Sequence, residues 1–175
     1  MSPLRALVPA VLALLVASCV RTDADQFRPL FNDAIAKATR SSQPMVERFL
    51  RICLDTMGRA SRAGAQARQR GFSPVNNVRG SFLGQSGANN EEFAAIAGRG
   101  YRCSIGKLDG APVARFADEF RTAMLAIGAE EAGPNRYRVR GKPTLGSGKV
   151  FFYHAMLTAE KGGAMLAIGT PNLVN

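Results

Sequence analysis

The first nineteen residues constrain this chain most, because they decide which part of it folds and in which compartment. A short start that carries Arg5 leads into an uncharged apolar run from Ala6 to Ala17, and Ser18 and Cys19 close the run. A basic start, a short apolar run and a small-residue exit are typical of a secretory signal peptide. A membrane-spanning helix needs about 20 apolar residues, and this run is shorter. We therefore expect residues 1–18 to be a signal peptide that does not belong to the folded domain.

The end of this run resembles the lipobox of bacterial lipoproteins. The resemblance covers residues 1–19 only, and its motif is Leu15, Val16, Ala17, Ser18 and Cys19. It implies that Cys19 is acylated and tethers the chain to a membrane on the periplasmic side of the cell envelope. It favours the outer membrane, because Val20 stands where an aspartate would signal inner-membrane retention. Ordinary cleavage without a lipid and an uncleaved anchor are the two alternatives.

Export bears on the two remaining cysteines, Cys53 and Cys103, because exported compartments are oxidising. Two cysteines that remain in such a compartment are expected to form a disulfide. This bridge would close a loop of about 50 residues, worth at most about 4 kcal/mol in the chain-entropy model. Two buried free thiols are the alternative. A catalytic thiol is disfavoured, because no Cys-x-x-Cys pair is present to activate one.

Length and charge bound the rest of the chain. We divide it into a signal peptide at 1–18, a short tether at 19–25 and a single domain at 26–175, which is a usual domain size. Without residues 1–18 the chain carries 22 lysines and arginines against 13 acidic residues, so its formal net charge is +9. In the cytosol this excess would indicate nucleic acid. Outside it we expect no nucleic acid, but an anionic envelope component or an envelope protein. A solvated basic surface without a partner is the alternative.

Helical periodicity predicts two or three N-terminal helices and one internal helix. The first covers 27–38. The second begins at Ser42 and runs to about Met57, or past Gly58 towards Gly71, with Cys53 on its core side. The internal helix begins at Pro112 and ends at Gly128. Its apolar face consists of Val113, Phe116, Phe120, Met124 and Ile127.

Strand alternation predicts a sheet of four strands, at 101–107, 136–140, 149–159 and 164–169. The strand at 149–159 is apolar on both faces, so we expect it in the middle of the sheet. The segment 73–90 is rich in Ser, Asn and Gly and is interpreted as a long loop, with a short strand near 78–83 as the alternative. The segment 92–98 is ambiguous between helix and strand. The predicted fold class is therefore α+β, with the helices packed on a mostly antiparallel four-stranded sheet.

Two sets of arginines form candidate anion-binding surfaces. One set lies on the solvent side of the second predicted helix, and the other projects from one face of the strand at 136–140. The first set is Arg48, Arg51, Arg59 and Arg62, and the second is Arg136, Arg138 and Arg140. If the two sets adjoin, they would create a strong positive field. The sequence leaves open whether they do.

His154 is the only histidine, so a serine or cysteine hydrolase built on this chain would have to use it as the general base. It shares a strand face with Val150, Phe152 and Met156, which favours a hydrogen-bonded core residue instead. No G-x-S-x-G motif is present, and the glycine-rich segment 146–149 lacks the features of a phosphate loop. One histidine and two paired cysteines do not complete a zinc site, so we expect no metal and no cofactor.

The leading hypothesis is a non-catalytic module of the cell envelope that binds an anionic or protein partner. It follows from the export signal, the net charge and the missing catalytic constellation. The alternative from a different class is a periplasmic hydrolase that uses His154 as its general base. A purely structural lipoprotein is the third hypothesis.

Overall fold

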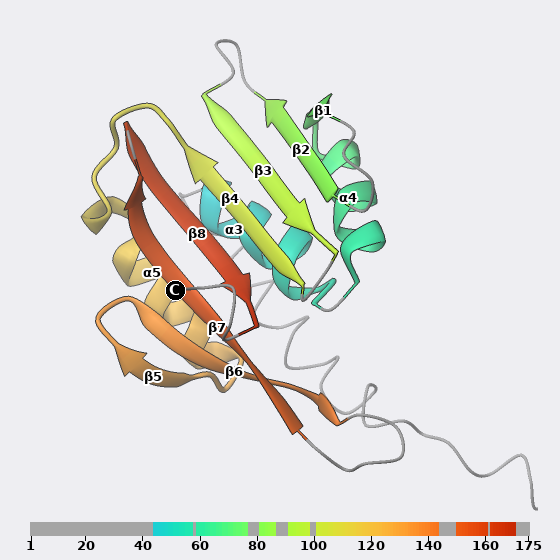
Figure 1. Ribbon diagram of the computed structural model, residues 1–175. Coiled ribbons are helices and arrows are strands. Elements are labelled where there is room, and N and C mark those ends of the chain that lie inside the picture. Colours follow the sequence, from blue (N-terminus) through green and yellow to red (C-terminus); the bar gives the residue numbers. More distant parts are fainter. Residues whose placement is uncertain are drawn as a thin grey trace, which may run out of the picture.

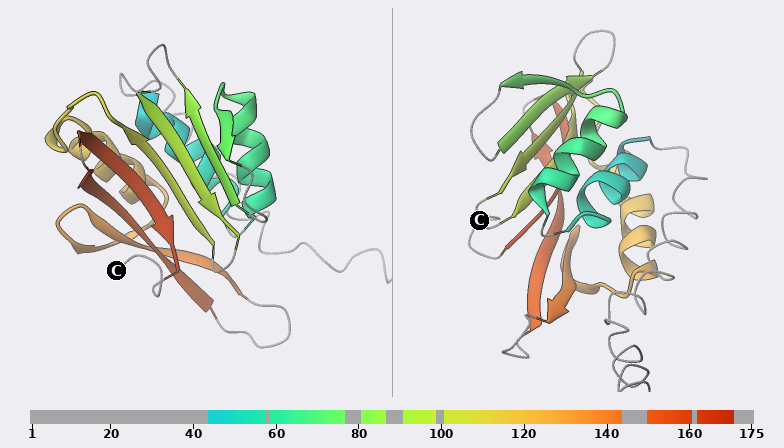
Figure 2. Two further views of the ribbon diagram at one scale, coloured as in Figure 1. Left: turned by 45° about the horizontal axis from the view of Figure 1, so that its top comes forward. Right: turned by 90° about the vertical axis from the view of Figure 1, so that its right-hand side faces the viewer.

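The computed structural model describes residues 44–57, 59–76, 81–86, 91–98, 101–143, 150–160 and 162–170. The predicted signal peptide, Cys19, the tether and the helix expected at 27–38 lie outside these residues. The described strands form one antiparallel sheet, and the described helices all lie on one of its faces (Figures 1 and 2). Within the described ranges, no helix is both long and apolar enough to cross a membrane.

The strands follow each other in space in the order β1-β2-β3-β4-β8-β7-β6-β5. Their bounds are β1 Ser73–Asn76, β2 Ser81–Ser86, β3 Glu92–Ala97, β4 Arg102–Lys107, β5 Glu130–Gly133, β6 Arg136–Pro143, β7 Val150–Glu160 and β8 Gly163–Gly169. The helical elements are α3 Pro44–Phe49, the π-helical turn η2 Leu50–Leu54, α4 Ala60–Gln69 and α5 Ala114–Ala126.

The prediction of a four-stranded sheet is wrong, because the sheet has eight strands, although helices packed on an antiparallel sheet are present. The four predicted strands correspond to β4, β6, β7 and β8, which are neighbours in the sheet. Four further strands lie outside these ranges. β1 and β5 were not predicted, β2 overlaps the alternative strand near 78–83, and β3 lies in the segment 92–98 that was ambiguous between helix and strand. Their composition is rich in Ser, Gly, Ala and Glu, which have little intrinsic strand preference, so cross-strand pairing decides their conformation.

The interpretation of 73–90 as a long loop is also wrong, because β1 and β2 form within it. The alternative, a short strand near 78–83, overlaps β2 at 81–83. In β2, Phe82 is buried while Ser81 and Leu83 are exposed. Gly84 makes room for the Phe82 ring, since a Cβ placed there would lie 2.7 Å from ring atoms. The glycine that suggested a loop is therefore a packing requirement of a strand.

The second predicted helix is interrupted rather than continuous. It consists of α3 and η2, and α4 begins only at Ala60 after a non-helical connection. The Thr56 hydroxyl donates to the Ile52 carbonyl, and the Tyr101 hydroxyl donates to the Cys53 carbonyl at 2.6 Å. These bonds satisfy carbonyl groups at the end of the π-helical turn, where regular helical partners are missing.

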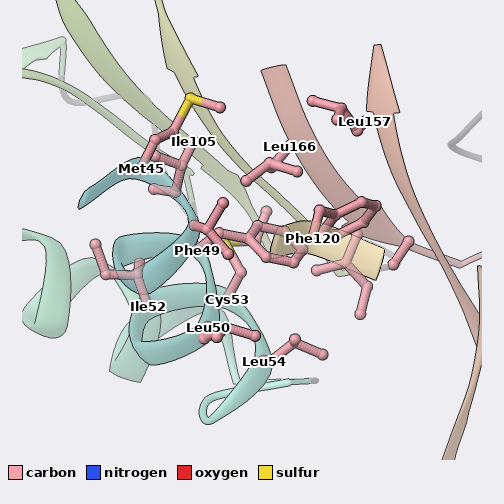
Figure 3. Packing of buried hydrophobic residues seen from close by; sticks show 14 of the residues in the cluster. Met45, Phe49, Leu50, Ile52, Cys53, Leu54, Ile105, Phe120, Leu157 and Leu166 are labelled. Atoms are coloured by element: carbon pink, nitrogen blue, oxygen red, sulfur yellow. A yellow bond between two sulfur atoms is a disulfide. The ribbon is translucent and has the colours of Figure 1, made fainter. Parts of the chain in front are cut away.

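The core lies between the helices and the sheet (Figure 3). A disulfide joins Cys53 of η2 to Cys103 of β4, with their Cα atoms 5.4 Å apart, and both residues are fully buried. Phe120 of α5 makes edge-to-face contacts with Phe49 and Tyr137, at centroid distances of 5.8 and 5.2 Å. α5 ends at Ala126, and Gly128 follows two residues later with a φ of 74°, which suits a glycine that terminates a helix.

Candidate anion-binding surface

The sheet has one face covered by helices and one face on which no described helix lies, and we call the second the open face. Figure 1 looks onto the open face, and the right-hand view of Figure 2 shows the helices gathered on the other side. Residues that pair directly across neighbouring strands point to the same face. The register of the strands therefore decides which side chains share the open face.

The arginines of β6 lie on the open face, as alternation along the strand predicts. Tyr137 and Val139 are each 3% exposed and belong to the core. Arg136, Arg138 and Arg140 alternate with them and are exposed. β6 thus divides its side chains cleanly, with apolar groups towards α5 and guanidinium groups towards solvent.

A register row across the sheet adds a fourth arginine to this face. Arg138 pairs with His154, His154 with Gly169, and Gly169 with Arg102 of β4. Because directly paired residues share a face, Arg102 projects on the same side as the β6 arginines, and it is exposed. Sequence reasoning did not include Arg102 among the candidates. The sequence feature that could have identified Arg102 is the alternation within 101–107. This alternation places Arg102 on the opposite strand face from the buried Cys103.

The charges of these arginines are only partly compensated. Arg138 binds Glu130 of β5, with its Nε atom 2.9 Å from the Oε2 atom. Its guanidinium also lies over the Phe152 ring, 4.7 Å from the centroid. Arg102, Arg136 and Arg140 make no ion pair with any residue in the described part of the chain. Most of the positive charge on the open face is therefore available to a partner.

His154 lies on the open face as well, so its interpretation as a core histidine is wrong. It is half-buried between its register partners Arg138 and Gly169. In the part that the structure describes, no hydroxyl or carboxylate forms a hydrogen bond with it. Ser104, a hydroxyl on the same face, is two strands away and only 3% exposed.

The helical arginines occupy a different surface and are not equivalent to one another. Arg48 forms an ion pair with Glu92 and lies over the Phe72 ring at 5.5 Å. Arg51 pairs with Glu47, with a distance of 3.0 Å between Nε and Oε1. Both arginines are therefore engaged within the fold, whereas the prediction placed them on a solvated stripe.

Two other members of this set, Arg59 and Arg62, lie at the beginning of α4. Both are exposed and make no ion pair within the described ranges. α4 contains no acidic residue, and two more arginines that were not among the candidates lie in it (Arg68) and directly after it (Arg70). Arg68 lies over the Phe82 ring at 5.0 Å. Arg70 bonds to Gln66, and burial, followed by the nearby charge of Arg51, lowers its pKa.

The two arginine sets do not adjoin. α4 packs on β2 and β3 from the covered side, whereas the β6 arginines project from the open side near the other end of the sheet. The right-hand view of Figure 2 shows α4 on the helix side of the sheet and the ribbon of β6 apart from it. The two sets therefore do not form one continuous surface, because the sheet and the helix layer lie between them.

The described residues give no support for a metal site or for a reactive thiol. Among the described residues, no three His, Cys, Asp or Glu side chains gather into a group that could hold a metal ion. Both described cysteines are bonded to each other, so neither offers a thiol. Comparison with protein-family models, with curated proteins and with solved structures yields no match to this chain. The candidate site therefore rests on the geometry of the open face alone.

Proposed function

We propose that this chain is a non-catalytic binding module of the cell envelope and that its open face binds an anionic partner. The observation that carries the proposal is the set of open-face arginines, Arg102, Arg136, Arg138 and Arg140, of which only Arg138 has an ion-pair partner in the described part. The envelope location rests on the predicted lipobox at Cys19.

Arginine suits this role better than lysine would. Its planar guanidinium presents several N–H donors in a fixed geometry that matches phosphate and carboxylate oxygens. The structure contains an internal example, because Glu130 already binds Arg138 from the neighbouring strand. An external anion would extend the same interaction to the arginines that lack such a partner.

The described residues show no hydrogen bond between His154 and a nucleophile, which the hydrolase alternative would require. A general base must lie within hydrogen-bond reach of the group that it deprotonates, directly or through one water. His154 has Arg138 and Gly169 as register partners, and neither can serve as a nucleophile. The hydrolase therefore stays a prediction without a supporting observation.

The proposal is tested by retention of the full chain on immobilised heparin, a soluble sulfated polyanion, during a sodium chloride gradient. The parent protein carries Cys19→Ser, which removes the predicted acylation site. The face variant adds Arg102→Gln, Arg136→Gln and Arg140→Gln. The helix control instead adds Arg59→Gln, Arg62→Gln and Arg115→Gln, which removes the same charge from exposed positions on the covered side.

We expect the face variant to elute at clearly lower salt than the helix control, because both have the same net charge and differ only in where the charge is lost. Thermal unfolding of all three proteins checks that they fold alike. Equal elution of the two variants would show that total charge, and not the open face, determines binding. That result would contradict the proposal.

A further inference from the structure

The open face mixes arginines with apolar side chains in a regular way. Arg140 pairs directly with Phe152, and Arg136 pairs directly with Met156. Each of these β6 arginines therefore has an apolar neighbour on β7, and both apolar side chains are half-buried. A partner that is purely polar would leave these apolar groups without a favourable contact.

More apolar side chains continue across the same face towards the other end of the sheet. Met165 of β8 and Phe93 of β3 are half-buried, and Leu83 of β2 is 41% exposed. The Phe93 ring occupies the space above Gly106, since a Cβ at that glycine would be 2.2 Å from ring atoms. The apolar groups are thus spread along the face rather than gathered in one pocket.

The basic groups are spread over a comparable area. Arg102 and Arg138 are three strand spacings apart, which is about 14 Å, and Arg136 and Arg140 are about 13 Å apart along β6. A single small anion reaches only one or two groups at such spacings. The arrangement fits a ligand that repeats its negative charges over a surface.

From this combination we infer that the open face docks on an anionic lipid bilayer. The arginines would contact headgroup phosphates, and the apolar side chains would enter the boundary between headgroups and acyl chains. Amphipathic surfaces with basic and aromatic groups bind bilayers in this way, and their affinity depends on anionic lipid. This inference rests on the proposed function and names the partner class for the same surface. Acylation of Cys19, as predicted, would keep the domain beside such a bilayer.

The first test measures co-sedimentation with vesicles, using the same three proteins as the heparin experiment. One vesicle preparation contains equal parts of phosphatidylglycerol and phosphatidylcholine, and the other contains phosphatidylcholine alone. We expect binding to the anionic vesicles, about hundredfold weaker binding for the face variant, and little change for the helix control. The estimate assigns about fivefold to each arginine near an anionic surface. Every protein keeps residues 1–18, so any contribution of that apolar run cancels in the comparison.

A second test reports which face meets the lipid. The chain contains no tryptophan, so a single introduced tryptophan gives an unambiguous fluorescence signal. Phe152→Trp places the reporter on the open face, and Leu125→Trp places a control at a 45% exposed position of α5 on the covered side. We expect a blue shift on adding anionic vesicles for Phe152→Trp only.

The outcomes separate this inference from the proposed function. Equal loss of vesicle binding in both arginine variants, or a blue shift only for Leu125→Trp, would overturn docking through the open face. Heparin binding that depends on the face arginines, without vesicle binding, would overturn the lipid inference and leave the proposed function standing. Failure to bind either heparin or anionic vesicles would contradict both.

Discussion

The two faces of the sheet are formed by the same strands, but they differ in how deeply their apolar side chains are buried and in what these side chains contact. On the covered face, Ile105, Leu166 and Ile168 are at most 1% exposed, and their strands pack against α3 and η2. On the open face, Phe152 and Met156 remain half-buried and pair with the exposed Arg140 and Arg136. The comparison teaches that apolar side chains on a strand do not by themselves identify the core. The helix layer determines which of two apolar faces becomes the interior.

The largest expected effect comes from a pair of phenylalanine substitutions, one on each side of this comparison. Phe120→Ala should lower the free energy of unfolding by about 3–5 kcal/mol, because the side chain is fully buried between Phe49 and Tyr137. Phe152→Ala on the open face should cost only about 1 kcal/mol, mainly the contact with Arg138. Urea denaturation measures both values. Equal costs would mean that the open face is also part of the core.

The disulfide belongs wholly to the covered side and should give the next largest effect. The double variant Cys53→Ala and Cys103→Ala should unfold with about 2–4 kcal/mol less free energy, because its unfolded chain is no longer constrained by the bridge between η2 and β4. Reduction of the parent protein should reproduce the loss in urea denaturation. A reductant that destabilised the double variant equally would contradict this explanation.

A smaller loss of the free energy of unfolding is expected at alkaline pH, and it too arises from residues on the covered side. Burial raises the pKa of Tyr101, Tyr137 and Tyr153, all of which contact the covered side. In the unfolded chain a tyrosine loses its proton near pH 10. In the folded protein the raised pKa keeps the buried tyrosine protonated at that pH. The unfolded state then binds fewer protons, so stability is intact below pH 10 and falls as the pH rises above it.

The loss should reach up to about 1.4 kcal/mol per pH unit for each tyrosine that titrates only in the unfolded chain. Measurements of unfolding free energy between pH 8 and 11 would show it. Tyr101→Phe should make the alkaline slope shallower, and it should cost about 1 kcal/mol at neutral pH through its lost bond to the Cys53 carbonyl. An unchanged slope in this variant would rule out Tyr101 as a source of the effect.

The smallest effect is expected at His154. His154→Ala should change the unfolding free energy by less than about 0.5 kcal/mol, because the side chain is half-buried on the open face and has no hydrogen bond within the described part. Leu157→Ala, on the covered face of the same strand and 4% exposed, serves as the control and should cost about 2–5 kcal/mol. A large destabilisation by His154→Ala would restore the core-histidine interpretation.

Local patterns were sufficient for part of the fold. The helix α5, the glycine that terminates it, and the alternation of Tyr137 and Val139 with three arginines were all predictable. Neighbouring residues determine helical and strand periodicity. The prediction missed β1 and β5, gave β2 only as an alternative and left β3 open between helix and strand. Most residues of these strands have little intrinsic strand preference, and pairing with the adjacent strands decides their conformation. The prediction also failed for His154, because both faces of β7 are apolar and periodicity does not say which face a helix covers.

The sequence by itself therefore determined which side chains share a face of α5 and of β6, including the arginines of β6. It also contained the cysteine pair and the excess of basic residues. Only the tertiary structure decided that Arg102 joins the β6 arginines through a register row, and that the helical arginines lie on the opposite side of the sheet. The physical reason is that alternation is a property of one strand. Pairing order and helix coverage arise from contacts between residues that are distant in the chain.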